Sequence, residues 1–191
     1  GYFESDLNLK KLKRKLYKLK KELPISDGQS NVGGWQKDLT RMQEFDFLKE
    51  YMSKIFSEYC FSTHPDFFNI EKVENFLSIH FPKVFCNINP PNAYHGAHMH
   101  YGGQFSSVIW LQADKNSGEI SINNPFPTNQ VTSLYENNVN INSNINSNIS
   151  HANVYPRPNT GVIFNNNIIH SVSPNRSERD RISLSFHIYL H

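Results

Sequence analysis

Leucines recur at spacings of three and four residues near the start of the chain, which is the period of one face of an α-helix. This apolar stripe lies within residues 6–23 and consists of Leu9, Leu12, Leu16, Leu19 and Leu23. Asp6 stands where a helix N-cap is expected. The remaining positions are mostly Lys and Arg, so the pattern predicts an amphipathic helix with one apolar and one basic side.

A second helical pattern covers residues 43–59, and its expected buried face is Phe45, Phe47, Leu48, Tyr51, Met52, Ile55 and Phe56. Between the two patterns, Gly28, Gly33 and Gly34 indicate a loop over residues 27–37 that presents Trp35. We expect a third helical piece at residues 70–80.

From about residue 83 onward, short apolar runs alternate with Gly, Pro and Asn, which is typical of strands in a sandwich or barrel. The expected strands are Val84–Ile88, Phe105–Leu111, Glu119–Ile122, Gly161–Phe164, Ile168–Val172 and Ile182–Leu190. The predicted fold class is therefore α+β, with helices first and a β core second.

A chain of 191 residues suits one domain. We expect a helical N-terminal support over residues 1–80 and a β core over residues 81–191. Residues 136–150 are a low-complexity tract of Asn, Ser and Ile, and we expect an inserted loop there. Such a loop at a barrel mouth acts as a lid, or it is a surface insertion without a role.

The amino-acid composition argues against a disordered, a membrane-spanning and a disulfide-rich protein. With 38% hydrophobic and 13% aromatic residues, a wholly disordered chain is excluded. No run approaches the roughly 18 apolar residues of a membrane span, so we expect no membrane association. Cys60 and Cys86 make no disulfide framework, and with no leader visible we expect a cytoplasmic protein.

The net charge of +2 is unevenly distributed, because residues 1–23 carry eight Lys or Arg against three Asp or Glu. We interpret this basic helix as a solvated face docked on the domain. The alternative is a patch for nucleic acid or an acidic membrane, which is not favoured because the lysines are not interleaved with a series of aromatic residues that could stack on bases; Tyr17 alone lies among them.

The densest chemical signal is the run from His95 to His100, which contains three histidines. Residues two apart on a strand point to the same face, so His98 and His100 would project together at about 7 Å and could share a metal. His170, beyond the apolar run at 161–164, is the candidate for a third ligand. The other histidines are assigned to structural or surface roles: His64, His80, His151, His187 and His191.

A second signal is Arg181-Ile182-Ser183, where Arg181 and Ser183 would share one face of a strand. A guanidinium beside a hydroxyl suits a carboxylate. If the strands at 161–172 and 181–190 pair as neighbours, Arg181 enters the same cavity as His170. The alternative is an arginine in an ordinary ion pair, because acidic residues lie nearby in the sequence.

A metal site beside a buried arginine implies a small acid bound to the metal. That is the arrangement of an oxygenase that uses non-haem iron and 2-oxoglutarate.

Residues 84–190 resemble the double-stranded β-helix, a jelly-roll or cupin-like fold, of the 2-oxoglutarate/Fe(II) dioxygenases. The resemblance is to prolyl 4-hydroxylase-like members and to a family of oxygenases found in phages and marine bacteria. The motifs that carry it are Asn87–Pro91, His98-Met99-His100, Ser107–Leu111, Ser117-Gly118-Glu119, Gly161–Phe164, His170 and Arg181-Ile182-Ser183.

The resemblance implies that His98 and His170 bind Fe(II), while Arg181 and Ser183 hold the far carboxylate of 2-oxoglutarate. It places Asn89, His95 and Trp110 near further pocket positions. With O2, such an enzyme would hydroxylate a substrate and release succinate and CO2. Five apolar residues are candidates for the pocket walls, with plain barrel core as the favoured alternative for each one singly: Phe105, Trp110, Ile120, Phe164 and Ile182.

His100 departs from the family pattern, which has Asp or Glu at this position. No acidic residue lies between residues 84 and 112, so we expect His100 to be the third ligand and to complete a catalytic set of three imidazoles.

Two alternatives stay open. One is a cupin-like three-histidine metalloprotein, either a dioxygenase independent of 2-oxoglutarate or a zinc hydrolase. The other is a non-enzymatic nucleic-acid-binding module that uses the basic helix. The prime substrate, whether a protein side chain, a nucleobase or a small molecule, and the oligomeric state do not follow from the sequence.

Overall fold

The computed structural model describes residues 1–28, 30–63, 78–123 and 151–191. In these ranges the chain forms two α-helices, one short 3-10 helix and eleven strands. In chain order they are β1 (Tyr2–Glu4), α1 (Leu9–Glu22), β2 (Asn31–Val32), β3 (Trp35–Asp38), η1 (Gln43–Phe45), α2 (Phe47–Thr63), β4 (Ile79–Asn89), β5 (Tyr94–His98), β6 (Phe105–Gln112), β7 (Ile120–Asn123), β8 (His151–Val154), β9 (Thr160–Asn165), β10 (His170–Val172) and β11 (Arg181–Leu190).

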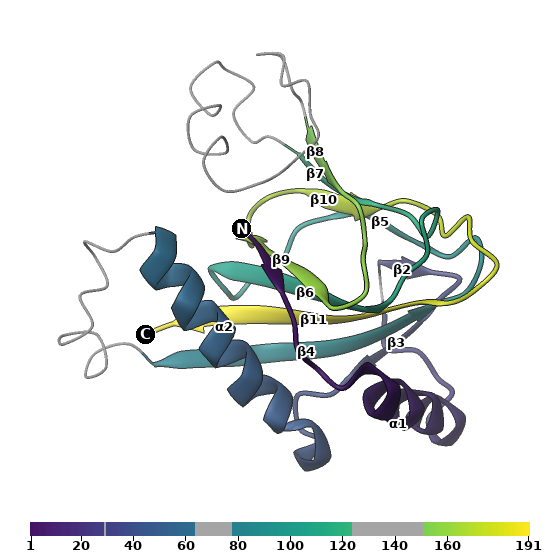
Figure 1. Cartoon of the computed structure of the whole chain (residues 1–191), viewed down its shortest axis with the longest axis horizontal. Coiled ribbons are helices and arrows are strands. Elements are labelled where there is room, and N and C mark those ends of the chain that lie inside the picture. The colour runs from purple at the N-terminus through teal and green to yellow at the C-terminus, as the bar shows by residue number, and fades with distance from the viewer. Residues whose placement is uncertain (29, 64–77, 124–150) are drawn as a thin grey trace.

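Two antiparallel sheets face each other. The larger has the strand order β1-β9-β6-β11-β4-β3, and the smaller has the order β2-β5-β10-β7-β8. Figure 1 shows the smaller sheet above the larger one, with α1 and α2 on the opposite side of the larger sheet. This is the double-stranded β-helix with supporting helices that the sequence predicted.

Side chains alternate along strand β11 between an apolar face toward the helices and a polar face toward the smaller sheet. Its residues Ile182, Leu184, Phe186 and Ile188 are fully buried in the core shared with the helices. The intervening residues Arg181, Ser183, Ser185 and His187 point the other way, between the two sheets. Each large apolar side chain buried on the helix side contributes about 1.5–3 kcal/mol to folding.

Helix α1 follows the leucine stripe, but its limits differ from the prediction. The N-cap is Asn8, whose side chain accepts a hydrogen bond from the Lys11 amide at 3.1 Å, so Asp6 is not the cap. Leu12, Leu16 and Leu19 are buried, whereas Leu23 lies past the last turn and is exposed. The prediction was wrong at both ends, because Asp6 and Asn8 are both suitable N-caps and the apolar period continues one residue past the last helical residue.

The second helical pattern divides into η1 and α2. Phe45, Leu48, Met52 and Phe56 are buried as expected, but Phe47 is 44% exposed. The chain turns from one helix type to the other at this point, so Phe47 leaves the apolar face. The third expected helix lies mostly outside the described residues, although its last two positions belong to β4. The tract at 136–150 also lies outside the described residues.

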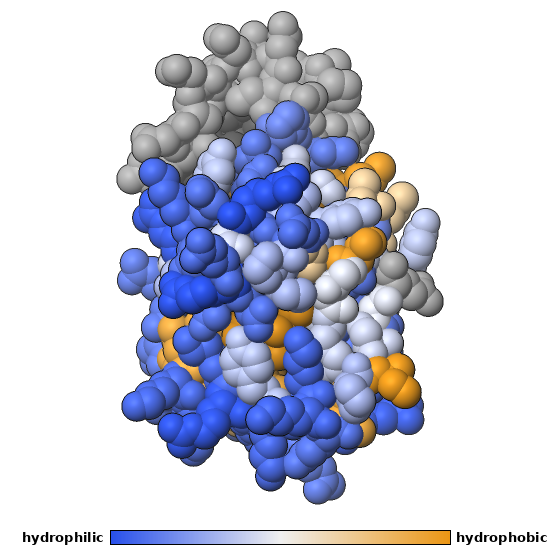
Figure 2. Space-filling model, turned by 90° about the vertical axis from the view of Figure 1, so that its right-hand side faces the viewer, coloured by the Kyte–Doolittle hydropathy of each residue, from blue (hydrophilic) through white to orange (hydrophobic). Residues whose placement is uncertain are grey.

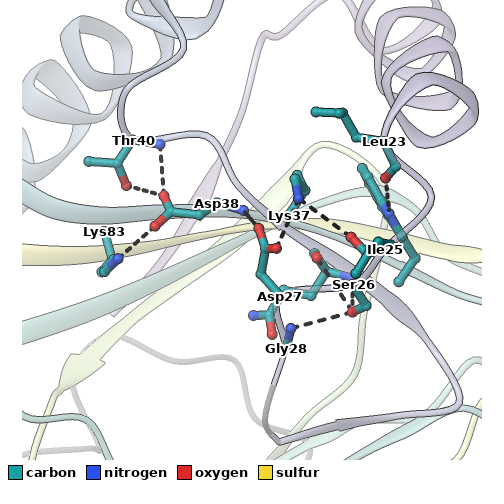
Figure 3. Close-up of polar contacts among 11 residues, drawn as sticks. Leu23, Ile25, Ser26, Asp27, Gly28, Lys37, Asp38, Thr40 and Lys83 are labelled. Carbon is teal, nitrogen blue, oxygen red and sulfur yellow. Dashed lines mark hydrogen bonds and ion pairs between the residues drawn. The ribbon is translucent and has the colours of Figure 1, made fainter.

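The segment expected to be a loop presenting Trp35 instead forms β2 and β3. Trp35 is 4% exposed, and its indole Nε1 donates to the Leu23 carbonyl at 2.9 Å. Figure 3 shows how the preceding segment is tied down: the Asp27 carboxylate accepts hydrogen bonds from Lys37 Nζ at 2.9 Å and from the Asp38 amide at 3.1 Å. This network fixes the chain just before Ser30, which reaches the space between the sheets.

Cys60 and Cys86 are buried and unbridged, as expected. No helix within the described ranges is long and apolar enough to cross a membrane. The face in Figure 2 is mainly hydrophilic, and its apolar residues form small separate groups.

Candidate metal centre

A pocket that is partly open to solvent lies between the two sheets. Both sheets contribute to it, and β11 runs along its floor. Its lining includes Ser30, Asn87, His95, His98, His100, Trp110, Ile120, Phe164, His170, Arg181, Ser183, Ser185 and His187.

Three imidazoles converge in this pocket. His98 ends β5, His170 begins β10, and the two are directly paired in the smaller sheet. With His100 they place one potential ligand nitrogen each within 4.8 Å of the others. Such a cluster of His nitrogens has the spacing and chemistry to hold a divalent transition metal.

Two of the imidazoles are oriented by the backbone. His98 Nδ1 lies 2.7 Å from the Gly96 carbonyl oxygen, and His170 Nδ1 lies 2.9 Å from the Ile168 carbonyl oxygen. A carbonyl oxygen only accepts hydrogen bonds, so each Nδ1 carries the proton and each Nε2 keeps its lone pair. Ser30 Oγ lies 3.5 Å from His98 Nε2. Metal-binding histidines are typically oriented in this way.

The protonation states suit metal binding. Burial lowers the pKa of His100 to about 2 and the pKa of His170 to about 4. Both rings are therefore neutral near pH 7, and a neutral imidazole is the form that binds metal.

His100 joins the cluster for a different reason from the one predicted. Strand β5 ends at His98, so the two-residue period of a strand does not apply to His100. Instead the His100 backbone amide donates to the Asn166 carbonyl at 3.1 Å. A tertiary contact of the loop after β5 thus brings the ring to within 4.8 Å of the His98 ring.

Arg181 is a buried cation with an unused donor. Its Nη1 donates to the carbonyl oxygens of Ser117, Ser173 and Gly118, whereas its buried Nη2 has no partner. Burial lowers the pKa of Arg181 to about 10, which leaves the group charged at neutral pH. The ion pair nearby is made by Arg179, with Asp114. Arg181 therefore offers a fixed positive charge and a free N–H to an anion.

The assumed reason for placing Arg181 beside His170 was wrong. Strand β9 pairs with β1 and β6, and β10 pairs with β5 and β7, so neither is a neighbour of β11. His170 and Arg181 share the pocket because their two sheets face each other.

The other residues predicted near the co-substrate lie partly in the pocket and partly behind it. Ser183, Trp110 and His95 line the pocket. Asn89 lies behind it, where its Oδ1 is 3.3 Å from His95 Nε2. Burial, with the charge of Arg181 as the second cause, lowers the pKa of His95 to about 3.

Three of the expected wall residues, Trp110, Ile120 and Phe164, line the pocket. Phe105 packs instead against Phe56 at a ring distance of 5.1 Å, and Ile182 is buried in the core on the helix side. The alternation along β11 explains why Ile182 belongs to the core, which was the favoured alternative, since it faces away from Arg181 and Ser183.

His187 was assigned to a structural or surface role. It is buried, not on the surface, and it lines the pocket with its ring centroid 4.1 Å from that of His100. Ser185 and Asn87 were also missed. The sequence contained a pattern that could have predicted the positions of Ser185 and His187. The two-residue period that places Arg181 and Ser183 on one face of the strand continues to both of them.

Comparison with known proteins gives one sequence match and several structural ones. Residues 83–187 match a family model described as "Putative 2OG-Fe(II) oxygenase". No curated protein matches the chain.

Among solved structures, a Pseudomonas putida prolyl-4-hydroxylase has a TM-score of 0.64 at 13% identity, covering 99% of this chain and 91% of that one. A Trichoplax adhaerens prolyl hydroxylase, in complex with a hypoxia inducible factor peptide fragment, has a TM-score of 0.62 at 14% identity, covering 98% and 82%. HygX from Streptomyces hygroscopicus, with nickel, 2-oxoglutarate and hygromycin B bound, has a TM-score of 0.61 at 11% identity, covering 98% and 81%. At these identities the likeness is one of fold.

Proposed function

The chain belongs to the 2OG-Fe(II) oxygenase family, and on that premise we propose that His98, His100 and His170 hold its iron while Arg181 and Ser183 hold its 2-oxoglutarate. It is a dioxygenase that uses Fe(II), 2-oxoglutarate and O2. The bound iron supplies the redox chemistry in which 2-oxoglutarate is converted to succinate and CO2 as a prime substrate is oxidised. The proposal concerns which residues of this chain do the binding.

The observation that carries the proposal is the convergence of three imidazole nitrogens within 4.8 Å. The Nδ1 protons of His98 and His170 are donated to backbone carbonyls, so their Nε2 atoms carry the lone pairs that can bind a metal. Three neutral ligands would leave the full positive charge of the metal in place, which favours binding of an anionic co-substrate.

Arg181 supports the second half of the proposal. 2-Oxoglutarate carries two carboxylates, and only one can chelate a metal together with the keto oxygen. The other needs a counter-charge elsewhere in the pocket. The unpartnered Nη2 of Arg181 can supply it as a charge-assisted hydrogen bond, with the Ser183 hydroxyl beside it.

The donor set departs from the two-histidine, one-carboxylate pattern of most members, and His100 is the residue in question. In the described part of the chain, the group of side chains able to hold a metal contains no carboxylate. We therefore propose His100 as the third ligand. Family membership favours this enzyme over the zinc hydrolase and the nucleic-acid-binding module.

We also propose that the chain folds as one domain. Strands β1 and β3, from the N-terminal part, pair with β9 and β4 of the core, which supports this. The prime substrate is proposed to be a protein side chain or a small molecule.

The proposal is tested by anaerobic titration of the Fe(II)-loaded protein with 2-oxoglutarate, followed by the visible charge-transfer band of the chelate. We expect a saturable band in the wild-type protein and none after His98→Ala or His170→Ala. Tight metal binding without a band would argue against the 2-oxoglutarate site. A band that persists in both variants would overturn the ligand assignment.

A further inference from the structure

The histidines of the pocket form a row whose two ends differ. Ring centroids are 6.5 Å apart between His95 and His98, 4.8 Å between His98 and His100, and 4.1 Å between His100 and His187. His95 contacts Asn89, which is paired with Arg181 across β4 and β11. The row therefore runs from the Arg181 end, past the metal ligands, to His187.

The spacing along β11 agrees with this order. Arg181 and His187 are six residues apart on one strand, which corresponds to about 20 Å between their Cα atoms. The metal ligands lie between these two positions. If 2-oxoglutarate occupies the Arg181 side, the His187 side is the part of the pocket left for the prime substrate.

His187 is a buried side chain with an unused hydrogen-bonding nitrogen. It is 8% exposed, and its Nε2 is buried without a hydrogen-bond partner. The ring is held between His100 and Phe85, whose ring centroid is 5.8 Å away. A buried polar atom without a partner is disfavoured, so a fixed ring with a free nitrogen in a pocket points to a bonding partner from outside the chain.

A second unpartnered group lies between the two ends of the pocket: Asn87 is opposite Ser183 in the pairing of β4 and β11, and its side chain bonds Ser185, which is two residues closer to His187. Asn87 is 2% exposed, and its Nδ2 donates to the Ser185 hydroxyl at 3.0 Å while its Oδ1 has no partner. If the amide were turned over, Ser185 would donate to Oδ1 and Nδ2 would be free instead. In either orientation one polar atom of Asn87 is left unsatisfied beside Ser185.

Charge defines the kind of ligand. Among the described residues that line the pocket, Arg181 is the one side chain with a permanent charge, and none is a carboxylate. The nearest lysine along β4, Lys83, is bound to Asp38 at 2.6 Å. A cationic group would find no counter-charge at the His187 end, and an anionic group would be drawn to Arg181 or to the metal.

We propose that His187 and Asn87 form a subsite that hydrogen-bonds an uncharged polar group, an amide or a hydroxyl, of the prime substrate. This inference rests on the proposed function, because it assigns the Arg181 end to 2-oxoglutarate. It assigns the oxidised substrate to a class: molecules that place a neutral hydrogen-bonding group close to the carbon that reacts.

The test uses three probes of similar size: acetamide, acetate and methylammonium. Each is titrated by ligand-observed NMR into full-length protein loaded with Zn(II) and saturating 2-oxoglutarate, so that no turnover occurs. We expect acetamide to bind at least tenfold more tightly than either ion. Equal or tighter binding of acetate or methylammonium would overturn the proposal.

Variants assign the binding to the two residues. His187→Phe keeps the ring that packs on His100 and removes its nitrogens, and Asn87→Leu removes the amide at similar size. We expect each to weaken acetamide binding at least fivefold. His80→Phe is the control, because His80 contacts His191 and does not line the pocket. Unchanged acetamide binding in both pocket variants would refute the subsite.

The Fe(II)/2-oxoglutarate band distinguishes failure of the proposed function from failure of the subsite. A wild-type protein with the band but no preference for acetamide keeps the proposed function and loses the subsite. A wild-type protein without the band loses the proposed function, and the subsite falls with it. If His187→Phe loses the band while the wild-type protein keeps it, that variant no longer reports on the subsite. Acetamide binding by Asn87→Leu then tests the subsite: weakened binding supports it and unchanged binding refutes it.

Discussion

His98 and His170 lie directly opposite each other in the antiparallel pairing of β5 and β10, and their ring centroids are 4.4 Å apart. Each donates its Nδ1–H to the carbonyl of the residue two positions earlier, Gly96 and Ile168. The same local arrangement thus occurs on two neighbouring strands. The pairing of the strands then brings the two unprotonated Nε2 atoms close together.

Removing one of these rings should remove the metal. We expect His170→Ala to weaken Fe(II) binding by more than the roughly 10–100-fold that loss of a partner to a ligand costs, because here a ligand itself is lost. Metal content after loading and desalting measures this. His80→Ala should keep its metal, and a His170→Ala protein with stoichiometric iron would contradict the assignment.

Changing Arg181 should act on 2-oxoglutarate rather than on the metal. Arg181→Lys keeps the charge and loses the planar fork, so the bond to the far carboxylate is lost or lengthened. Hydrogen bonds to charged groups are worth about 1.5–3 kcal/mol, which corresponds to a roughly 10–150-fold rise in the Kd for 2-oxoglutarate. Anaerobic titration measures the change.

Arg179→Lys is the matched control for that experiment, since Arg179 pairs with Asp114 on the surface and does not line the pocket. Its Kd should match the wild-type value. If the two variants bind 2-oxoglutarate equally well, Arg181 does not anchor it.

Gly118 should be intolerant of a side chain. Its φ is +90°, and an added Cβ would lie 2.1 Å from the Ser173 carbonyl oxygen and 2.6 Å from Arg181 Nη1. We expect Gly118→Ala to lower the free energy of unfolding by about 1–3 kcal/mol and to weaken 2-oxoglutarate binding by displacing Arg181. Urea unfolding and the titration above measure both effects.

Gly96→Ala is the comparison, because a Cβ at Gly96 meets nothing within 4 Å. It should change stability by less than about 0.5 kcal/mol, in line with ordinary surface substitutions. Equal effects at the two glycines would show that the close approach to Arg181 does not matter.

The metal-free protein should lose stability as the pH falls from about 6.5 towards 4. Burial lowers the pKa of His170 and of His187 to about 4, below the ordinary value of 6.5 that they regain on unfolding. The unfolded chain therefore binds more protons in this window. Each of these histidines costs up to about 1.4 kcal/mol of unfolding free energy per pH unit.

Urea unfolding of the metal-free protein at pH 7.5, 6 and 5 checks this expectation. The change in unfolding free energy per pH unit should become smaller in His187→Phe, because one titrating group is removed. Stability that is constant across the window would mean that these rings are protonated as readily in the folded protein as in the unfolded chain.

Local patterns in the sequence were sufficient for much of the fold and for the core of the site. The leucines of α1 and the alternation in β6 and β11 are repeats that depend on neighbouring residues alone. The order of His98, His100, His170, Arg181 and Ser183 along the chain was also enough to predict that they would meet. Each of them lines the pocket.

The tertiary structure decided what depends on partners distant in the chain. Strand pairing joins residues by hydrogen bonds between segments far apart, and no local period specifies which segments meet. For this reason the sequence did not predict that β10 and β11 belong to different sheets. Nor did it predict that the buried Trp35 indole donates to the Leu23 carbonyl, or that the His100 amide donates to the Asn166 carbonyl. His187 showed the right period along β11, but only the packing of one sheet over the other placed it against His100.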